Sequence, residues 1–191
     1  FIAEDENHVL IDADYSQIEL RVLAHIAQDE AMIAAFRAGQ DIHAATAAKV
    51  YGVPVDEITG QMRSSCKAVN FGIVYGISAF SLSDDIKVSV AEAKEYMERY
   101  LATFSGVAAY QSNVVEEAKE KGYVSTLMGR RRWLPELKSA NHNLRSFGER
   151  VALNMPIQGT AADIIKLAMV KVFDRLKKEK LEARLIMQVH D

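Results

Sequence analysis

The chain has 191 residues, 49% of them hydrophobic and 26% charged, which is typical of a soluble globular protein. A membrane-spanning helix is excluded, because even the apolar stretch at 164–173 is interrupted by lysines before it reaches the ~20 residues needed. The net charge of −3 excludes a global cationic field, so any nucleic-acid partner must be bound by local basic clusters, such as the consecutive Arg130, Arg131 and Arg132.

The cellular setting follows from the single cysteine. Cys66 has no partner for an internal disulfide, and no apolar leader opens the sequence, so we expect a reducing, cytoplasmic environment. We assign Cys66 no chemistry and expect it to be a small buried residue. The chain starts without Met and stops in a strand-like run, so we expect it to be part of a longer protein.

The first half predicts one strand followed by helices. The sequence VLIDAD at 9–14 is typical of a short buried strand, and Ser16 then opens an amphipathic helix. Ser16 and Glu19 match the capping-box spacing, which explains Glu19 without any ligand. Further helices are expected at 41–51, 62–75, 90–104 and 107–121.

The second half predicts a hairpin, a long helix and a second strand. Bulky and polar residues alternate around Gly129, which favours a small hairpin or irregular turn that carries the arginines outward. A helical region at about 143–181 is expected to bend near Pro156 and Gly159, and ARLIMQV at 183–189 supplies the strand. We therefore expect an α+β fold, mostly helical, in which the two distant strands pair in one sheet.

Four residues of the helix at 62–75 form a strip of two cations and two aromatics. Arg63, Lys67, Phe71 and Tyr75 are four positions apart, so each is displaced ~40° from the last and all lie on one face. The cations could bind phosphate oxygens and the aromatics could stack on a base, as in a nucleoside triphosphate site. The alternative is that the aromatics are core residues and the cations extend into water.

A metal site is the second hypothesis. Asp14 lies where a strand gives way to a helix, and Asp191 ends the other strand. With the main-chain carbonyl of Tyr15 these carboxylates form a hard oxygen set suited to two Mg²⁺ ions, which could clamp a phosphoryl transfer. Taken singly, Asp14 is equally explained as a capping or turn residue and Asp191 as a terminal charge.

A polar stripe and a histidine complete the candidates. Arg150, Asn154 and Gln158 repeat the four-residue spacing on the long helix. They either form a solvated face or line a cleft and contact a nucleic-acid duplex with little sequence preference. His43 follows Asp41, an expected helix cap, and by default is an ordinary first-turn residue.

Three segments in order resemble motifs A, B and C of the family A DNA polymerases: DYSQIELR at 14–21, RSSCKAVNFGIVYG at 63–76 and QVHD at 188–191. GRRRWLPEL and NMPIQGTAADIIK are also similar to that family, so the resemblance spans essentially the whole chain. It implies a right-hand polymerase with a partial palm sheet and an inserted helical fingers subdomain. The implied boundaries are palm at 1–25, fingers at 26–140 and palm again at 141–191.

The resemblance also implies a role for each candidate residue. Asp14, Asp191 and the Tyr15 carbonyl would hold two Mg²⁺ ions, with Lys67 assisting the departing pyrophosphate. Glu19 would crowd the sugar 2′ position, where one of its oxygens could still act as the cap. The triphosphate, the incoming nucleotide and the template base would be contacted by His43, Arg63, Lys67, Phe71 and Tyr75, and the primer and template by Arg150, Asn154, Gln158 and His190.

The implied function is template-directed addition of deoxynucleotides to a primer 3′-OH in DNA replication and repair. The implied partners are primer-template DNA and deoxynucleoside triphosphates, with no membrane and with the protein acting as a monomer. A single-subunit RNA polymerase is one alternative, although Glu19 argues against it. A non-catalytic nucleic-acid or nucleotide-binding module is the other.

Overall fold

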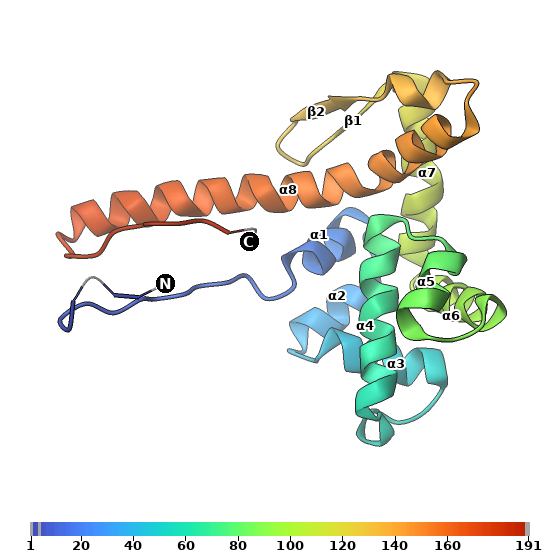
Figure 1. The fold of residues 1–191 in the computed structure, drawn as a ribbon, viewed down its shortest axis with the longest axis horizontal. Coiled ribbons are helices and arrows are strands. Elements are labelled where there is room, and N and C mark those ends of the chain that lie inside the picture. The colour runs from blue at the N-terminus through green and yellow to red at the C-terminus, as the bar shows by residue number, and fades with distance from the viewer. Residues whose placement is uncertain (1, 4, 190–191) are drawn as a thin grey trace.

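The computed structural model describes residues 2–3 and 5–189, and they are mostly helical (Figure 1). Two short 3₁₀ helices and one hairpin interrupt the α-helices. The helices are α1 (Ile18–Ile26), α2 (Glu30–Arg37), α3 (Ile42–Tyr51), η1 (Val55–Glu57), α4 (Gly60–Tyr75), α5 (Ala79–Ile86), α6 (Val90–Thr103), α7 (Ser105–Lys121), η2 (Pro135–Lys138) and α8 (His142–Lys178). No helix within the described ranges is long and apolar enough to cross a membrane.

Most of the predicted helices are confirmed, and their ends are set by capping residues. Asp41 caps α3 as expected, its carboxylate accepting hydrogen bonds from the backbone N–H groups of His43 and Ala44. Helix α4 ends at Gly76, which has φ of 65°, a left-handed conformation that favours glycine. Helices α2 and α5 were not predicted separately, because their apolar pattern covers only two turns each.

The capping-box prediction at the start of α1 is wrong. The N-cap residue is Gln17 in a left-handed conformation, with no side-chain cap hydrogen bond, so Ser16 lies before the helix. Glu19 is therefore not used as a cap, and its buried side chain is available for another contact.

Two apolar clusters hold the helices together. The larger lies among α1, α3, α4 and α6, and its fully buried members include Leu20, Leu23, Val69 and Tyr100. The smaller joins α7, the hairpin, η2 and α8 through residues such as Val124 and Ala152. Together they fix α4 against α1 and α8, the arrangement on which the candidate site depends.

The predicted hairpin is present as β1 (Tyr123–Ser125) and β2 (Arg131–Trp133), paired antiparallel. All three arginines of the hairpin are exposed, as predicted, but Arg130 also binds α8. Its Nε and Nη2 atoms donate to Asp163 and to the Gly159 carbonyl of α8, both at 2.9 Å. A Cβ on Gly159 would lie 2.7 Å from a Thr126 methyl carbon, so this glycine permits the close packing of the hairpin on α8.

The prediction that 9–14 and 183–189 pair as strands is wrong. Neither segment is a strand, and the only sheet within the described residues is the hairpin. Their apolar side chains are exposed, including Ile11 and Val189, because no neighbouring strand or helix covers them. Figure 1 shows both as extended segments on the same side of the view, where the C-terminal half of α8 lies.

The long helical region is confirmed as one helix. Helix α8 continues through Pro156 and Gly159 without a break, and Figure 1 shows it curving along its length. The Thr160 hydroxyl donates to the Pro156 carbonyl at 2.5 Å inside this helix. Pro156 has no backbone N–H, so α8 lacks one backbone hydrogen bond at this point, but the helix continues past it.

Candidate active site

Helix α4 presents the predicted cation and aromatic strip on its outer face. Its buried face consists of Cys66, Val69, Asn70, Gly72, Ile73 and Val74. Arg63 and Lys67 are exposed, Phe71 is half-buried and Tyr75 is 37% exposed, so the alternative that the two aromatics are core residues is excluded. The Phe71 and Tyr75 rings are nearly parallel, at 15°, with centroids 6.3 Å apart.

The two cations of the strip differ in their partners. Arg63 donates from Nε to Asp41 at 2.7 Å, an exposed ion pair that joins α4 to the start of α3. Partial burial alone would raise the pKa of the Asp41 carboxyl group. The hydrogen bonds that this group accepts from Arg63, Ala44 and His43 outweigh burial, so the pKa of Asp41 is lowered. Lys67 forms no ion pair within the described part of the chain, and its Nζ lies 6.0 Å from the Phe71 ring centre. Lys67 is therefore an available cation.

His43 lies beside this strip but is only 2% exposed. Its ring centre is 5.9 Å from that of Phe71, and its Nδ1 atom is 3.0 Å from Nδ2 of Asn70. Burial of the ring and the nearby positive charges of Arg63 and Lys67 lower the pKa of His43 to about 4, because together they outweigh the opposing effect of the Asp41 carboxylate. His43 is therefore neutral at pH 7.

Glu19 and Tyr75 connect α1 to the end of α4. The Tyr75 hydroxyl donates to Glu19 Oε2 at 3.0 Å, although the two residues are 56 positions apart. Glu19 is 7% exposed, so its carboxylate sits in a defined position next to the aromatic end of the strip. This hydrogen bond joins the segment at 14–21 to the segment at 63–76.

Helix α8 adds part of its polar stripe to the same end of α4. Asn154 donates from Nδ2 to the Tyr75 carbonyl at 3.3 Å, while its Oδ1 atom is buried without a partner among the described residues. A cleft of about 790 Å³ lies between α4, α5 and α8, lined by Phe71, Tyr75 and Arg150 among others. Gln158 lies one turn further along α8 and is half-buried.

The predicted metal ligands are described only in part. Asp14 and Tyr15 lie in the exposed segment before α1, and Asp14 forms no hydrogen bond or ion pair with the described residues. An exposed carboxylate beside a main-chain carbonyl suits a hard cation such as Mg²⁺. Asp191 and His190 lie outside the described residues, and within these no group of three acidic, histidine or cysteine side chains converges.

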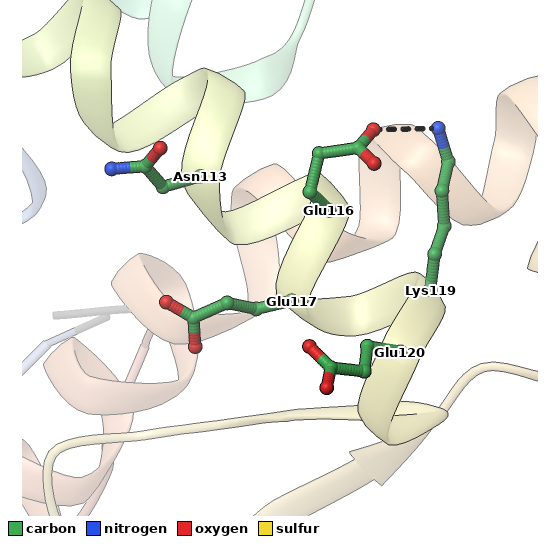
Figure 2. A pocket seen from close by; sticks show the side chains of 5 residues that line it. All are labelled: Asn113, Glu116, Glu117, Lys119 and Glu120. Atoms are coloured by element: carbon green, nitrogen blue, oxygen red, sulfur yellow. Dashed lines mark hydrogen bonds and ion pairs between the residues drawn. The ribbon is translucent and has the colours of Figure 1, made fainter.

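An acidic face of α7 is not part of this site. Figure 2 shows the carboxylates of Glu116 and Glu117 pointing in different directions, with Glu116 paired to Lys119 at 3.1 Å. Lys119 also lies 3.4 Å from Glu149 of α8. These ion pairs stabilise α7 and link it to α8. The carboxylates shown in Figure 2 do not converge into a ligand set.

Comparison with known proteins identifies the family of the chain. The model of DNA polymerase family A matches residues 1–191. The chain belongs to DNA polymerase family A. It is 54% identical to the DNA polymerase I of Geobacillus stearothermophilus and 55% identical to that of Bacillus subtilis, in each case over all of this chain and 22% of the relative. It thus spans about a fifth of these family A polymerases.

A solved family A structure is similar in fold as well as in sequence. It is the POL domain of Pol1 from M. smegmatis, described as a complex with DNA primer-template and dNTP. It superimposes with a TM-score of 0.89 at 48% identity, covering 93% of this chain and 31% of that one.

Sequence reasoning missed two contributors to the site of this family A chain. Asp41 was predicted as a cap, but its second role as the partner of Arg63 depends on the packing of α3 on α4. Asn70 was not singled out. The sequence does carry a signal for Asn70, because it is a polar amide at a position that shares the buried face of α4 with Val69 and Ile73. A buried amide requires hydrogen-bond partners.

Proposed function

We propose that this chain forms part of the catalytic core of a DNA polymerase that adds deoxynucleotides to a primer 3′-OH as directed by a template. The observation that carries the proposal is the 3.0 Å hydrogen bond from Tyr75 to Glu19. It places a buried carboxylate next to an exposed strip of two cations and two aromatics, a combination suited to a nucleotide's sugar, phosphates and base.

The residues of the strip have distinct roles in this proposal. Arg63, Lys67 and His43 bind the triphosphate, and Lys67 offsets the charge that develops on the departing pyrophosphate. Phe71 packs on the incoming nucleotide, and Tyr75 lies near the template base. Because Arg63 is paired with Asp41 in this structure, binding of the triphosphate has to compete with that ion pair.

Two further groups of residues position the DNA and the metal ions. Arg150, Asn154, Gln158 and His190 contact primer and template and position them with little sequence preference. Asp14, the Tyr15 carbonyl and Asp191 would hold two Mg²⁺ ions. When bound, such ions activate the 3′-OH and stabilise charge on the transferred phosphate.

The remaining parts of the proposal concern organisation and setting. Residues 1–25 and 141–191 belong to a palm and residues 26–140 to fingers, with primer-template DNA and deoxynucleoside triphosphates as partners. The polymerase acts as a cytoplasmic monomer in replication and repair. Replacing Asp14 by asparagine tests the catalytic proposal against a non-catalytic binding module, because the module should keep every activity in that variant, whereas a polymerase should lose templated extension.

Glu19→Ala should admit ribonucleotides more readily. Removal of the buried carboxylate opens space at the proposed sugar 2′ position, and we expect the preference for deoxynucleotides to fall about 10–100-fold. The measurement is kcat/KM for matched ribo- and deoxynucleoside triphosphates in primer extension.

Two variants act as controls for this result. Glu19→Gln keeps the volume and should retain the exclusion, and Tyr75→Phe removes the hydroxyl that donates to Glu19 without opening the pocket. Unchanged sugar selectivity in Glu19→Ala would contradict the role given to Glu19 and would count against the polymerase assignment.

A further inference from the structure

The last turn of α4 is closed by hydrogen bonds of its own backbone. The N–H of Ile77 donates to the Gly72 carbonyl at 2.9 Å, and the N–H of the left-handed Gly76 donates to the Ile73 carbonyl at 3.3 Å. These two bonds form the Schellman motif, which commonly ends a helix at a glycine. The carbonyl oxygens of this turn can accept further hydrogen bonds, because each oxygen has two lone pairs.

Two side-chain amides from other helices bind the same turn. Gln111 of α7 donates from Nε2 to the Ile73 carbonyl at 3.2 Å, and Asn154 of α8 donates from Nδ2 to the Tyr75 carbonyl at 3.3 Å. The orientation of the Gln111 amide is determined, because a carbonyl oxygen only accepts and a flipped amide would place two acceptors face to face. The end of α4 is therefore linked to both α7 and α8 by side chains.

Gln111 is a polar residue on the inward face of α7. The residues that share this face with it, Val107, Val114 and Ala118, are apolar and buried or half-buried. Gln111 is itself half-buried, and a polar group in such a place needs a hydrogen-bond partner. An apolar side chain would satisfy the packing of this face, so the amide is explained by its hydrogen bond to α4.

The two ends of the α4 strip are held differently. At the cationic end, Arg63 pairs with Asp41 at the surface, where both side chains are at least 40% exposed, and such a pair contributes little. At the aromatic end, Tyr75 donates to the buried carboxylate of Glu19, and the two amides bind the backbone of the same turn. The aromatic end is therefore the more firmly held of the two.

We propose that Gln111 is a positioning residue of the nucleotide site, whose amide holds the last turn of α4 so that Phe71 and Tyr75 stay aligned with the cleft between α4, α5 and α8. Both aromatics line this cleft and Gln111 does not, so Gln111 acts through the Ile73 carbonyl. The inference rests on the proposed function for the ligand of the site, whereas the hold on α4 does not depend on it.

Hydrogen exchange of the backbone amides measures the hold on α4 directly. Gln111→Met has a similar length and suits the apolar face of α7, but it has no donor for the Ile73 carbonyl. We expect exchange at Gly76 and Ile77 to become about 3- to 10-fold faster, as for the loss of one hydrogen bond. Unchanged exchange at both positions would overturn the inference whatever the function of the protein.

Two further variants keep this test specific. Gln111→Glu keeps the shape, but its carboxylate only accepts, so it should accelerate exchange at least as much as Gln111→Met. Tyr110→Phe removes a comparable hydrogen bond of α7, to the Leu153 carbonyl of α8 at 3.1 Å, and should leave exchange at Gly76 and Ile77 unchanged. Equal acceleration in Tyr110→Phe and Gln111→Met would overturn the specific role of Gln111, because general loosening of α7 would then explain it.

Single-turnover incorporation of a matched deoxynucleotide, by a family A polymerase that carries this chain, tests the role in nucleotide binding. We expect Gln111→Met to weaken the apparent affinity for the deoxynucleotide about 3- to 10-fold and to change the maximal rate by less than about twofold, because Lys67 is untouched. Unchanged affinity in Gln111→Met with impaired incorporation in Lys67→Ala would overturn the positioning role alone. Unchanged incorporation in both variants would overturn the nucleotide site itself and leave the hold on α4 in place.

Discussion

Replacing Lys67 by alanine is expected to lower kcat/KM for nucleotide incorporation by on the order of 10²–10³-fold. Lys67 is the exposed cation of the α4 strip that has no ion-pair partner among the described residues, so its charge is available to the triphosphate. Loss of a fixed positive charge next to a developing negative charge acts mainly on the transition state. Single-turnover incorporation by a polymerase that carries these residues measures the effect.

Two variants separate this effect from general loss of charge. Lys67→Arg keeps the positive charge but changes its geometry, so we expect partial activity. Lys94→Ala removes an exposed lysine of α6 that pairs with Glu98, and should leave incorporation unchanged. Equal rates for Lys67→Ala and wild type would show that the strip does not bind the triphosphate.

Asp29→Ala is expected to destabilise the chain by about 2–4 kcal/mol. Asp29 is 3% exposed and serves two helices at once, because Oδ1 accepts from the Met32 N–H of α2 and Oδ2 accepts from the Gly106 N–H of α7, both at 3.0 Å. Alanine would leave the buried N–H of Met32 and the half-buried N–H of Gly106 without this partner. Equilibrium unfolding in urea measures the loss of free energy.

A matched cap gives the reference for this second result. Ser78 caps α5 at an exposed position, where its Oγ accepts from the Ser81 N–H and lies 3.1 Å from the Ser81 hydroxyl, so Ser78→Ala should cost about 1 kcal/mol. Asp29→Asn should fall between the two. An Asp29→Ala cost no larger than that of Ser78→Ala would contradict the bridging role of Asp29.

The helices and the composition of the strip could be predicted from the sequence because both depend on local spacing. Four-residue periodicity placed Arg63, Lys67, Phe71 and Tyr75 on one face, and the exposure of that face is confirmed. Asp41 was recognisable as a cap from its position before an apolar run. Gly76 ends α4, which explains its presence without a ligand.

What could not be predicted depends on contacts between distant segments. The pairing of Glu19 with Tyr75 and of Asn70 with His43 joins residues 56 and 27 positions apart, and no local pattern encodes such contacts. The capping-box spacing at Ser16 was misleading because Gln17 adopts a left-handed conformation and α1 begins at Ile18. The segments at 9–14 and 183–189 have the composition of strands, but a strand also needs a partner.

The most direct test of the central claim is templated primer extension with Mg²⁺ and deoxynucleotides by a family A polymerase that carries this chain, beside its Asp14→Ala variant. We predict that the wild type extends the primer and that the variant does not, because Asp14 is the exposed carboxylate proposed to hold the metal ions. Primer binding should be retained in the variant. Undiminished extension by Asp14→Ala would contradict the claim that this chain contains the catalytic centre.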